Sequence, residues 1–206
     1  MTTRSTPRRP RDREATQARL LDAARRLIES EGVLAGVTLS KVADEAGVNR
    51  GQIYQYFGTR RHLLRAALAS MSSQRADEAD FAQPFRRRRM TAFDKAIERN
   101  AEIRLDALLA LDGDTDLGLF PVYDRAIDAL RQDVKAGALP ADTDVELMHV
   151  LTAATYLGYA VFREAMAEET SIPLPELDSR ARASFARIVD AVAGSGTPDR
   201  TPHDNE

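Results

Sequence analysis

The chain contains no cysteine, and its three histidines are scattered at positions 62, 149 and 203. The lack of cysteine excludes a disulfide framework, a thiolate metal site and a cysteine nucleophile. The scattered histidines supply no paired metal ligands, and the sequence has neither a glycine-rich phosphate loop nor a nucleophile elbow. We therefore do not expect an enzyme, and we expect no metal or other cofactor.

Long apolar segments are also lacking. The longest uncharged apolar run, 147–162, falls short of the roughly 20 residues that a membrane-spanning helix needs, so a buried helix explains it better. The basic amino terminus is not followed by the apolar stretch of a secretory signal. The lack of cysteine also fits a reducing cytosol. Together these features predict a cytoplasmic protein with no membrane partner.

Charge is unevenly distributed along the chain. The net charge is −3, but residues 1–70 hold 13 Lys or Arg against 7 Asp or Glu, whereas residues 71–206 carry a net −9. A basic first third on an acidic remainder suggests that the first third meets a polyanion.

Helical periodicity runs through most of the sequence and no strand pattern competes with it, which predicts an all-α fold. The composition changes near 72–84, where serine, glutamine and acidic residues lead into Pro84. We predict a disordered basic arm (1–12), a three-helix amino-terminal domain (13–75), a second helical domain (76–193) and a disordered tail (194–206). Within them, helices are expected at 16–31, 38–46, 49–57, 59–71, 84–98, 100–111, 120–136, 143–168 and 177–193.

Two short helical segments between 38 and 57 are joined by a turn at 47–49, the pattern of a helix-turn-helix. Gly47 permits a tight turn, and Val48 is expected to fill the core beneath it. In the second segment Ile53 and Phe57 lie four residues apart and point inward, which leaves the polar positions from 50 to 56 free. Glutamine suits adenine and arginine suits guanine in the major groove, while tyrosine and threonine hydroxyls suit phosphates.

The run from Thr38 to Phe57, TLSKVADEAGVNRGQIYQYF, resembles the signature of the tetracycline-repressor (TetR) family. The resemblance covers residues 13–70 closely and the remainder only in helix count and in the stretch 137–144. It implies phosphate contacts from hydroxyl and basic side chains: Thr38, Ser40, Tyr54, Tyr56 and Arg60 or Arg61. It implies base or groove contacts from Asn49, Arg50, Gly51, Gln52 and Gln55. The sequence departs from the family at Gln52, where a small residue is common, and at Thr59-Arg60-Arg61, where Ser-Lys-Glu is usual.

The resemblance also implies that the second domain binds a ligand between 84 and 168 and dimerises through the last two helices. Broad apolar faces on those two helices support an interface independently, because they exceed what one small core needs. The interface residues predicted from these faces are Leu151, Thr155, Tyr159, Phe162, Ala181, Phe185 and Ile188. Packing within one chain is the alternative for these faces.

A ligand pocket in this domain would need an apolar or aromatic lining with a few polar groups. The predicted lining is Phe93, Ile97, Arg104, Leu108, Tyr123, Ile127, His149 and Tyr156. Stripes of this kind are more often plain core than the lining of a pocket. The arginine run 86–89, in contrast, is typical of a solvated helix face. Contact with the flanks of the DNA and pairing with the acidic residues at 77–80 are the alternatives for this run.

Together these features predict a sequence-specific transcriptional regulator that binds a palindromic operator in double-stranded DNA as a homodimer. A small hydrophobic or aromatic effector is expected to release a repressor of this kind. The alternative is a ligand-independent DNA-binding or architectural protein, which would show little sequence preference and a steep salt dependence.

Overall fold

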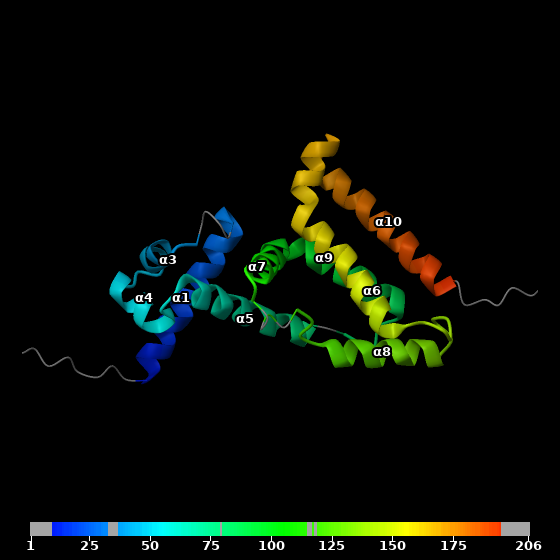
Figure 1. The fold of residues 1–206 in the computed structure, drawn as a ribbon, viewed down its shortest axis with the longest axis horizontal. Helices are drawn as coiled ribbons and strands as arrows, with labels where there is room; N and C mark the ends of the chain where they lie inside the picture. Colours follow the sequence, from blue (N-terminus) through cyan, green and yellow to red (C-terminus); the bar gives the residue numbers. More distant parts are fainter. Residues whose placement is uncertain (1–9, 33–36, 79, 115–116, 118, 195–206) are drawn as a thin grey trace, which may run out of the picture. The chain divides into compact units, whose positions relative to one another are not determined.

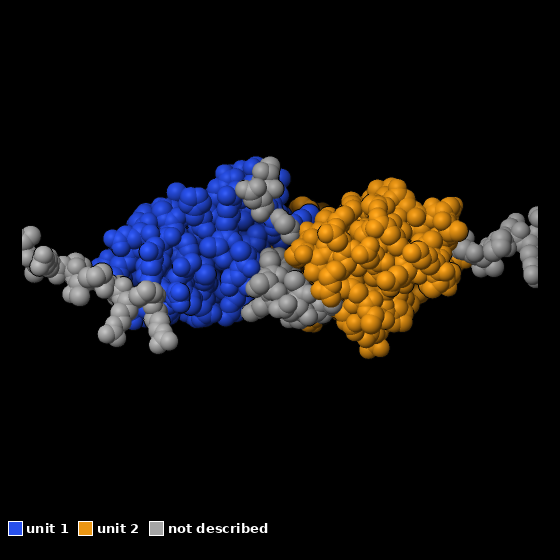
Figure 2. Space-filling model, turned by 90° about the horizontal axis from the view of Figure 1, so that it is seen from below, with its two compact units in different colours: residues 1–77, 104–119 blue, residues 78–103, 120–206 orange. Residues whose placement is uncertain are grey.

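The computed structural model describes residues 10–32, 37–78, 80–114, 117 and 119–194. Within these ranges the chain forms nine α-helices and no strand, so the predicted all-α fold class is confirmed. The helices group into two compact units, residues 1–77 with 104–119 and residues 78–103 with 120–206 (Figure 2). Each unit is described by itself.

The first unit contains α1 (Pro10–Glu31), α3 (Leu39–Glu45), α4 (Arg50–Phe57) and α5 (Arg60–Glu78), together with most of α7 (Asn100–Leu111) (Figure 1). Its core is apolar, with α1 packed on α3 and α3 packed on α4. The side chains with no solvent exposure include Leu20, Val37, Val42, Ile53 and Leu63. The two short helices are thus held by burial against their longer neighbours, since seven or eight residues alone would not stay helical in water.

Helix α1 begins at Pro10, six residues before the predicted start. Proline is well tolerated at the first helical position because its missing N–H would have no partner there. Thr16, the predicted start, lies inside the helix and its hydroxyl donates to the Asp12 carbonyl at 2.7 Å. Residues 10–12 of the predicted arm therefore form the first helical turn, and the rest of the arm and residues 195–206 of the tail lie outside the described residues.

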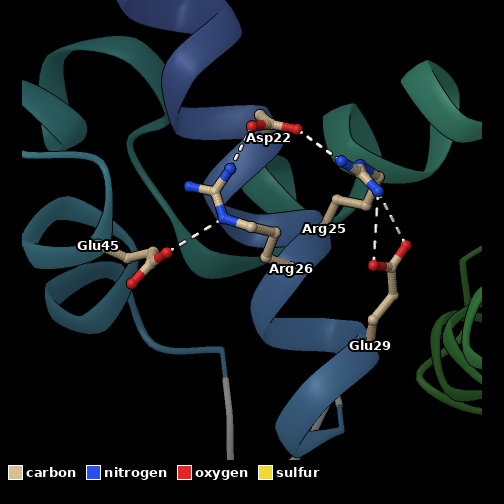
Figure 3. A network of polar contacts seen from close by, with 5 residues as sticks. All are labelled: Asp22, Arg25, Arg26, Glu29 and Glu45. Atoms are coloured by element: carbon tan, nitrogen blue, oxygen red, sulfur yellow. Dashed lines mark hydrogen bonds and ion pairs between the residues drawn. The ribbon is translucent and has the colours of Figure 1, made fainter.

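An ion-pair network on α1 reaches across to α3 (Figure 3). Arg25 bonds Asp22 at 2.8 Å and Glu29 at 3.1 Å along the same helix, whereas Arg26 bonds Asp22 and also Glu45 of α3, the latter at 3.1 Å. All five side chains are about half exposed, so each pair contributes only a few tenths of a kcal/mol, up to about 1 kcal/mol. Within this network the bond between Arg26 and Glu45 joins α1 to α3.

The second unit contains α6 (Phe85–Glu98), α8 (Tyr123–Lys135), α9 (Val145–Thr170) and α10 (Leu174–Gly194). Helices α6 and α9 each pack against α10, and α8 packs against α9 (Figure 1). One buried cluster joins them: Phe85, Met90, Phe93, Ile127, Leu130, Leu139, Val145, Phe185 and Val189. The predicted helices 120–136, 143–168 and 177–193 correspond to α8, α9 and α10, with ends that differ by one to three residues.

Two nearly buried ion pairs hold this unit together. Arg88 of α6 bonds Asp133 of α8, and Arg163 of α9 bonds Asp178 of α10 at 2.6 Å. Asp178 also accepts the Tyr159 hydroxyl at 2.8 Å. Because each carboxylate meets its cation in a low-dielectric setting, removal of either partner would leave a costly unpaired charge.

Among the described residues, α9 is long and apolar enough to cross a membrane by length and composition alone. The same test is passed by many core helices, so this is weak evidence of a span. About a quarter of the apolar window, 28%, is buried inside the protein, and the buried part lies against α6, α8 and α10. The other residues of the window are half-buried or exposed.

Candidate nucleic-acid interface

The turn between α3 and α4 has the geometry of a helix-turn-helix. The Thr38 hydroxyl accepts the Lys41 amide at 3.1 Å and so caps the start of α3, while the Asn49 side chain accepts the Gly51 amide at 2.8 Å and caps α4. Gly47 has a φ of 62°, in the left-handed region where glycine carries no Cβ penalty. Val48 is buried beneath the turn. The predicted roles of Gly47 and Val48 are therefore confirmed.

Helix α4 separates an inner face from an outer face. Ile53 and Phe57 are buried in the core of the first unit, as their spacing predicts. The outward positions carry polar and aromatic side chains, of which Arg50, Gly51, Tyr54 and Gln55 are exposed and Gln52 and Tyr56 are half-buried. A short helix with one face anchored and the other free is the arrangement that can enter a major groove.

Two of the outward residues already have partners within the protein. Arg50 forms an exposed ion pair with Asp44 at 2.7 Å, and the hydrogen bond from Arg50 holds the pKa of the Asp44 carboxyl below its usual range. Tyr56 lies beneath the guanidinium of Arg13, which is 5.7 Å from the ring centroid. Arg13 was not among the predicted contacts, yet it places a cation from α1 beside α4.

The two arginines that open α5 do not point freely outward. Arg60 donates to the Val37 carbonyl at 2.5 Å and so ties α5 to the start of the helix-turn-helix. Arg61 lies 3.5 Å from the Asp112 carboxylate and 3.7 Å from that of Asp114. Asp114 is fully buried and also pairs with Arg65, so these arginines hold the end of α7 against α5 within the first unit.

The predicted pocket residues fall into both units. Phe93 and Ile127 are in the buried core of the second unit, and Ile97, Tyr123 and Tyr156 pack against it. His149 belongs to the same unit, where its ring meets Tyr123 edge-on at 5.6 Å and Phe120 at 4.9 Å. Arg104 and Leu108, on α7, group with the first unit. The structure thus brings six of the eight predicted residues together in one helical unit.

Sequence reasoning missed Arg89. The run 86–89 is not a uniformly solvated face, because Arg89 is 95% buried and Arg88 is nearly so. A signal was present, since Arg89 lies four residues from both Phe85 and Phe93 and so shares their inward stripe on α6. A charged residue in an apolar stripe at that spacing marks a buried polar site.

The predicted interface residues on α9 and α10 are of two kinds. Leu151 and Phe162 are each 58% exposed, Ile188 and Thr155 are also exposed, and Ala181 is half-buried. Phe185 is 2% exposed and stacks on Phe93 at 5.1 Å, so it packs within the protomer and its placement in an interface was wrong. Tyr159 likewise stacks on Phe93 and donates a hydrogen bond to Asp178. Burial, together with this hydrogen bond, raises the pKa of the Tyr159 hydroxyl.

Residues 20–67 match the family model described as bacterial regulatory proteins of the tetR family. Among curated proteins, the transcriptional regulator SrpR of Pseudomonas putida is 29% identical over 149 residues, which cover 65% of this chain and 68% of SrpR. The regulator BetI of Rhizobium meliloti (strain 1021) is 42% identical over 60 residues, only 29% of either chain. Both matches are to proteins of the helix-turn-helix class.

Solved structures extend the likeness of fold to most of the chain. A Rhodococcus sp. protein assigned to the TetR family has a TM-score of 0.65 at 21% identity and covers 88% of this chain and 100% of its own. SCO4942 of Streptomyces coelicolor has a TM-score of 0.64 at 20% identity and covers 85% and 97%. These helical neighbours confirm the arrangement of an amino-terminal helix-turn-helix domain and a carboxy-terminal helical domain. The domain built on α1, α3 and α4 is therefore a helix-turn-helix domain of the tetR family of bacterial regulatory proteins.

Proposed function

We propose that this regulator is a repressor that binds a palindromic operator as a homodimer and is released by a small apolar or aromatic effector. The observation that carries the proposal is α4, whose inner face is anchored by the buried Ile53 and Phe57 while its outer face is polar and largely exposed. Tyr54 and Gln55 are the exposed side chains with the best chemistry for phosphate and base contacts respectively. Sequence preference then comes from Gln55, Gln52 and Arg50.

For Arg50 the proposal requires an exchange of partners. Its guanidinium is paired with Asp44, and both side chains are more than half exposed. An exposed pair of this kind is weak because water screens both charges, whereas a bidentate contact to guanine discriminates strongly between bases. Arg50 would therefore leave Asp44 for a matching base and stay with Asp44 on a mismatched site, which adds to discrimination.

The outer face of α9 supports the homodimer. Leu147, Leu151, Phe162 and Met166 are large, apolar and 41–58% exposed, and their spacing places them on one stripe with Thr155 and Gly158. Monomeric proteins rarely leave such a stripe in water. A second copy of α9 is the partner that an isologous interface would supply, and two-fold symmetry would present two copies of α4 to successive major grooves about 34 Å apart.

The second unit supports the effector site. Its core combines aromatic side chains with the polar His149 and Tyr156, a mixture suited to a small ligand. One neighbour of similar fold, with a TM-score of 0.55 at 20% identity, is a gamma-butyrolactone receptor. Release would follow by population shift, since an effector that prefers one arrangement of the dimer disfavours the arrangement in which both α4 helices fit the operator.

Selection of bound fragments from random-sequence DNA tests the proposal. The full chain is expected to enrich a palindrome whose half-sites are centred about 10 base pairs, or one helical turn, apart. Phe162→Glu should place a charge in the α9 stripe and turn the dimer into monomers that enrich single half-sites. Leu111→Glu is the matched control, because Leu111 is also a large exposed apolar side chain, at 86%, but lies on α7.

Two outcomes would count against parts of the proposal. Enrichment of no sequence at all, with binding that falls steeply as salt increases, would favour the alternative of an architectural DNA-binding protein. If Phe162→Glu enriched the same palindrome and kept the molecular mass of the wild-type assembly in solution, the α9 stripe would not be the dimer interface.

A further inference from the structure

Arg89 is a buried cation in the core of the second unit. Only 5% of it is exposed, and among the described residues none accepts a hydrogen bond from its buried Nε. Its guanidinium carbon lies 5.6 Å from the centroid of the Phe85 ring, one helical turn away. Burial lowers the pKa of Arg89, which shows that the surroundings penalise its charge. A buried guanidinium without an anion is costly to keep in a folded protein.

The carboxylate of Asp133 does not neutralise Arg89. Asp133 lies within electrostatic range of Arg89, but it bonds the neighbouring Arg88 in a nearly buried ion pair. Two arginines therefore share one carboxylate, which leaves the inner side of α6 with a surplus positive charge. Arg86, on the outer side of the same helix, is paired with Asp190 and takes no part in this balance.

His149 of α9 faces the same region and is also unsatisfied. It is 7% exposed, and neither of its ring nitrogens has a hydrogen-bond partner within the described part of the chain. Burial, with a contribution from the charge of Arg89, lowers its pKa to about 4, so the ring is neutral at physiological pH. A neutral imidazole offers one N–H donor and one acceptor. Buried groups of this kind normally find partners, so two exceptions within electrostatic range of each other point to a missing partner.

Aromatic rings surround these polar groups. Phe120 and Tyr123 contact the His149 ring, and Phe85 covers the guanidinium of Arg89. Tyr156, seven residues after His149 on the same face of α9, is within electrostatic range of Arg89. The site therefore combines a fixed positive charge, a spare N–H and apolar walls.

We propose that this site binds the carboxylate of a small organic acid with an aryl or acyl body, the carboxylate accepting hydrogen bonds from Arg89 and His149. This inference rests on the proposed effector-released repressor and names the chemistry of its effector. The carboxylate would supply the anion that Arg89 lacks, and the Phe120 and Tyr123 rings would pack on the apolar body. An uncharged ligand of the same shape would leave the guanidinium unpaired, so the site discriminates by charge as well as shape.

The test compares carboxylates with their uncharged amides on the full chain without DNA. 2-Naphthoate with 2-naphthamide and decanoate with decanamide are two suitable pairs, and calorimetry or thermal unfolding measures binding. At least one carboxylate is expected to bind about tenfold or more tightly than its amide. Equal binding of acid and amide in both pairs, or no binding of either acid at millimolar concentration, would overturn the proposal.

Two variants assign the preference to Arg89. Arg89→Met, which keeps much of the volume without the charge, is expected to lose the tenfold preference while the free protein stays at least as stable as wild type. Arg86→Met, on the same helix, is expected to keep it. If the Arg89→Met variant still preferred the carboxylate to its amide, the proposal would be overturned.

A spectroscopic readout separates anion binding from general stabilisation. A bound carboxylate would offset the positive charge next to His149, so the pKa of His149 followed by NMR is expected to rise on addition of the acid and not on addition of the amide. No change in the His149 titration on saturation with a tightly bound acid would contradict the site. These measurements use no DNA, so their failure would leave the operator selection above untouched.

Discussion

Replacing Ile53 with alanine is expected to lower the free energy of unfolding by about 2–5 kcal/mol and to abolish measurable operator binding. Ile53 has no solvent exposure and is one of only two buried side chains in the eight-residue helix α4. Because a helix this short depends on tertiary packing, the cavity loosens the same element that contacts DNA. Urea denaturation and fluorescence anisotropy with the selected operator measure the two effects.

Gln55→Ala provides the matched control for Ile53→Ala. Gln55 is exposed on the same helix, and its loss is expected to change the free energy of unfolding by less than about 0.5 kcal/mol. If Ile53→Ala retained wild-type operator affinity, α4 would not be the element that depends on this packing for DNA contact.

Acidification from pH 7 to pH 4 is expected to cost about 3 kcal/mol of stability through His149 alone. Burial and Arg89 lower the pKa of His149 in the folded protein to about 4, against 6.5 for an ordinary histidine. Between pH 6.5 and pH 4, this histidine is protonated in the unfolded chain but mostly neutral in the folded protein. The stabilisation is therefore complete above pH 6.5 and is lost as the pH falls towards 4.

Urea denaturation at pH 7, 5.5 and 4.5 measures this dependence in wild type and in His149→Phe. Phenylalanine preserves an aromatic ring between Phe120 and Tyr123 but does not titrate, so the variant should lose less stability than wild type over the same range. Tyr123→Phe keeps the histidine and is expected to keep the full dependence. Identical pH profiles for wild type and His149→Phe would show that His149 is not held neutral by burial.

Most of the helical frame could be predicted from the sequence, because amphipathic spacing and caps are local signals. Helix α7 has the predicted bounds 100–111, and α3 and α4 lie where Thr38, Gly47 and Asn49 indicated. The start of α1 was placed too late, because the predicted first residue, Thr16, lies inside the helix, where its hydroxyl donates to the carbonyl of Asp12.

The surroundings of several side chains could not be predicted for a different reason. Periodicity predicts which face of a helix a residue lies on, but not which other element covers that face. Phe185 lies on an apolar face of α10 that α6 covers within the same chain, so it stacks on Phe93 instead of meeting a partner. Arg89 sits in a run of arginines that composition assigns to solvent, although its phase on α6 points it inward. Arg61 meets Asp112 and Asp114, which are about 50 residues away in sequence and could not be found by local reasoning.

The specificity of two α4 variants tests the central claim most directly, since the outer face of α4 is proposed to read base sequence. Binding of wild type, Gln55→Ala and Tyr54→Ala is measured on the selected operator and on random DNA at one salt concentration. Gln55→Ala should lose about 1–3 kcal/mol of preference for the operator with its affinity for random DNA unchanged, whereas Tyr54→Ala should weaken both alike. An operator preference left intact by Gln55→Ala would contradict the account, because the face of α4 that carries Gln55 would then not be the one that meets the bases.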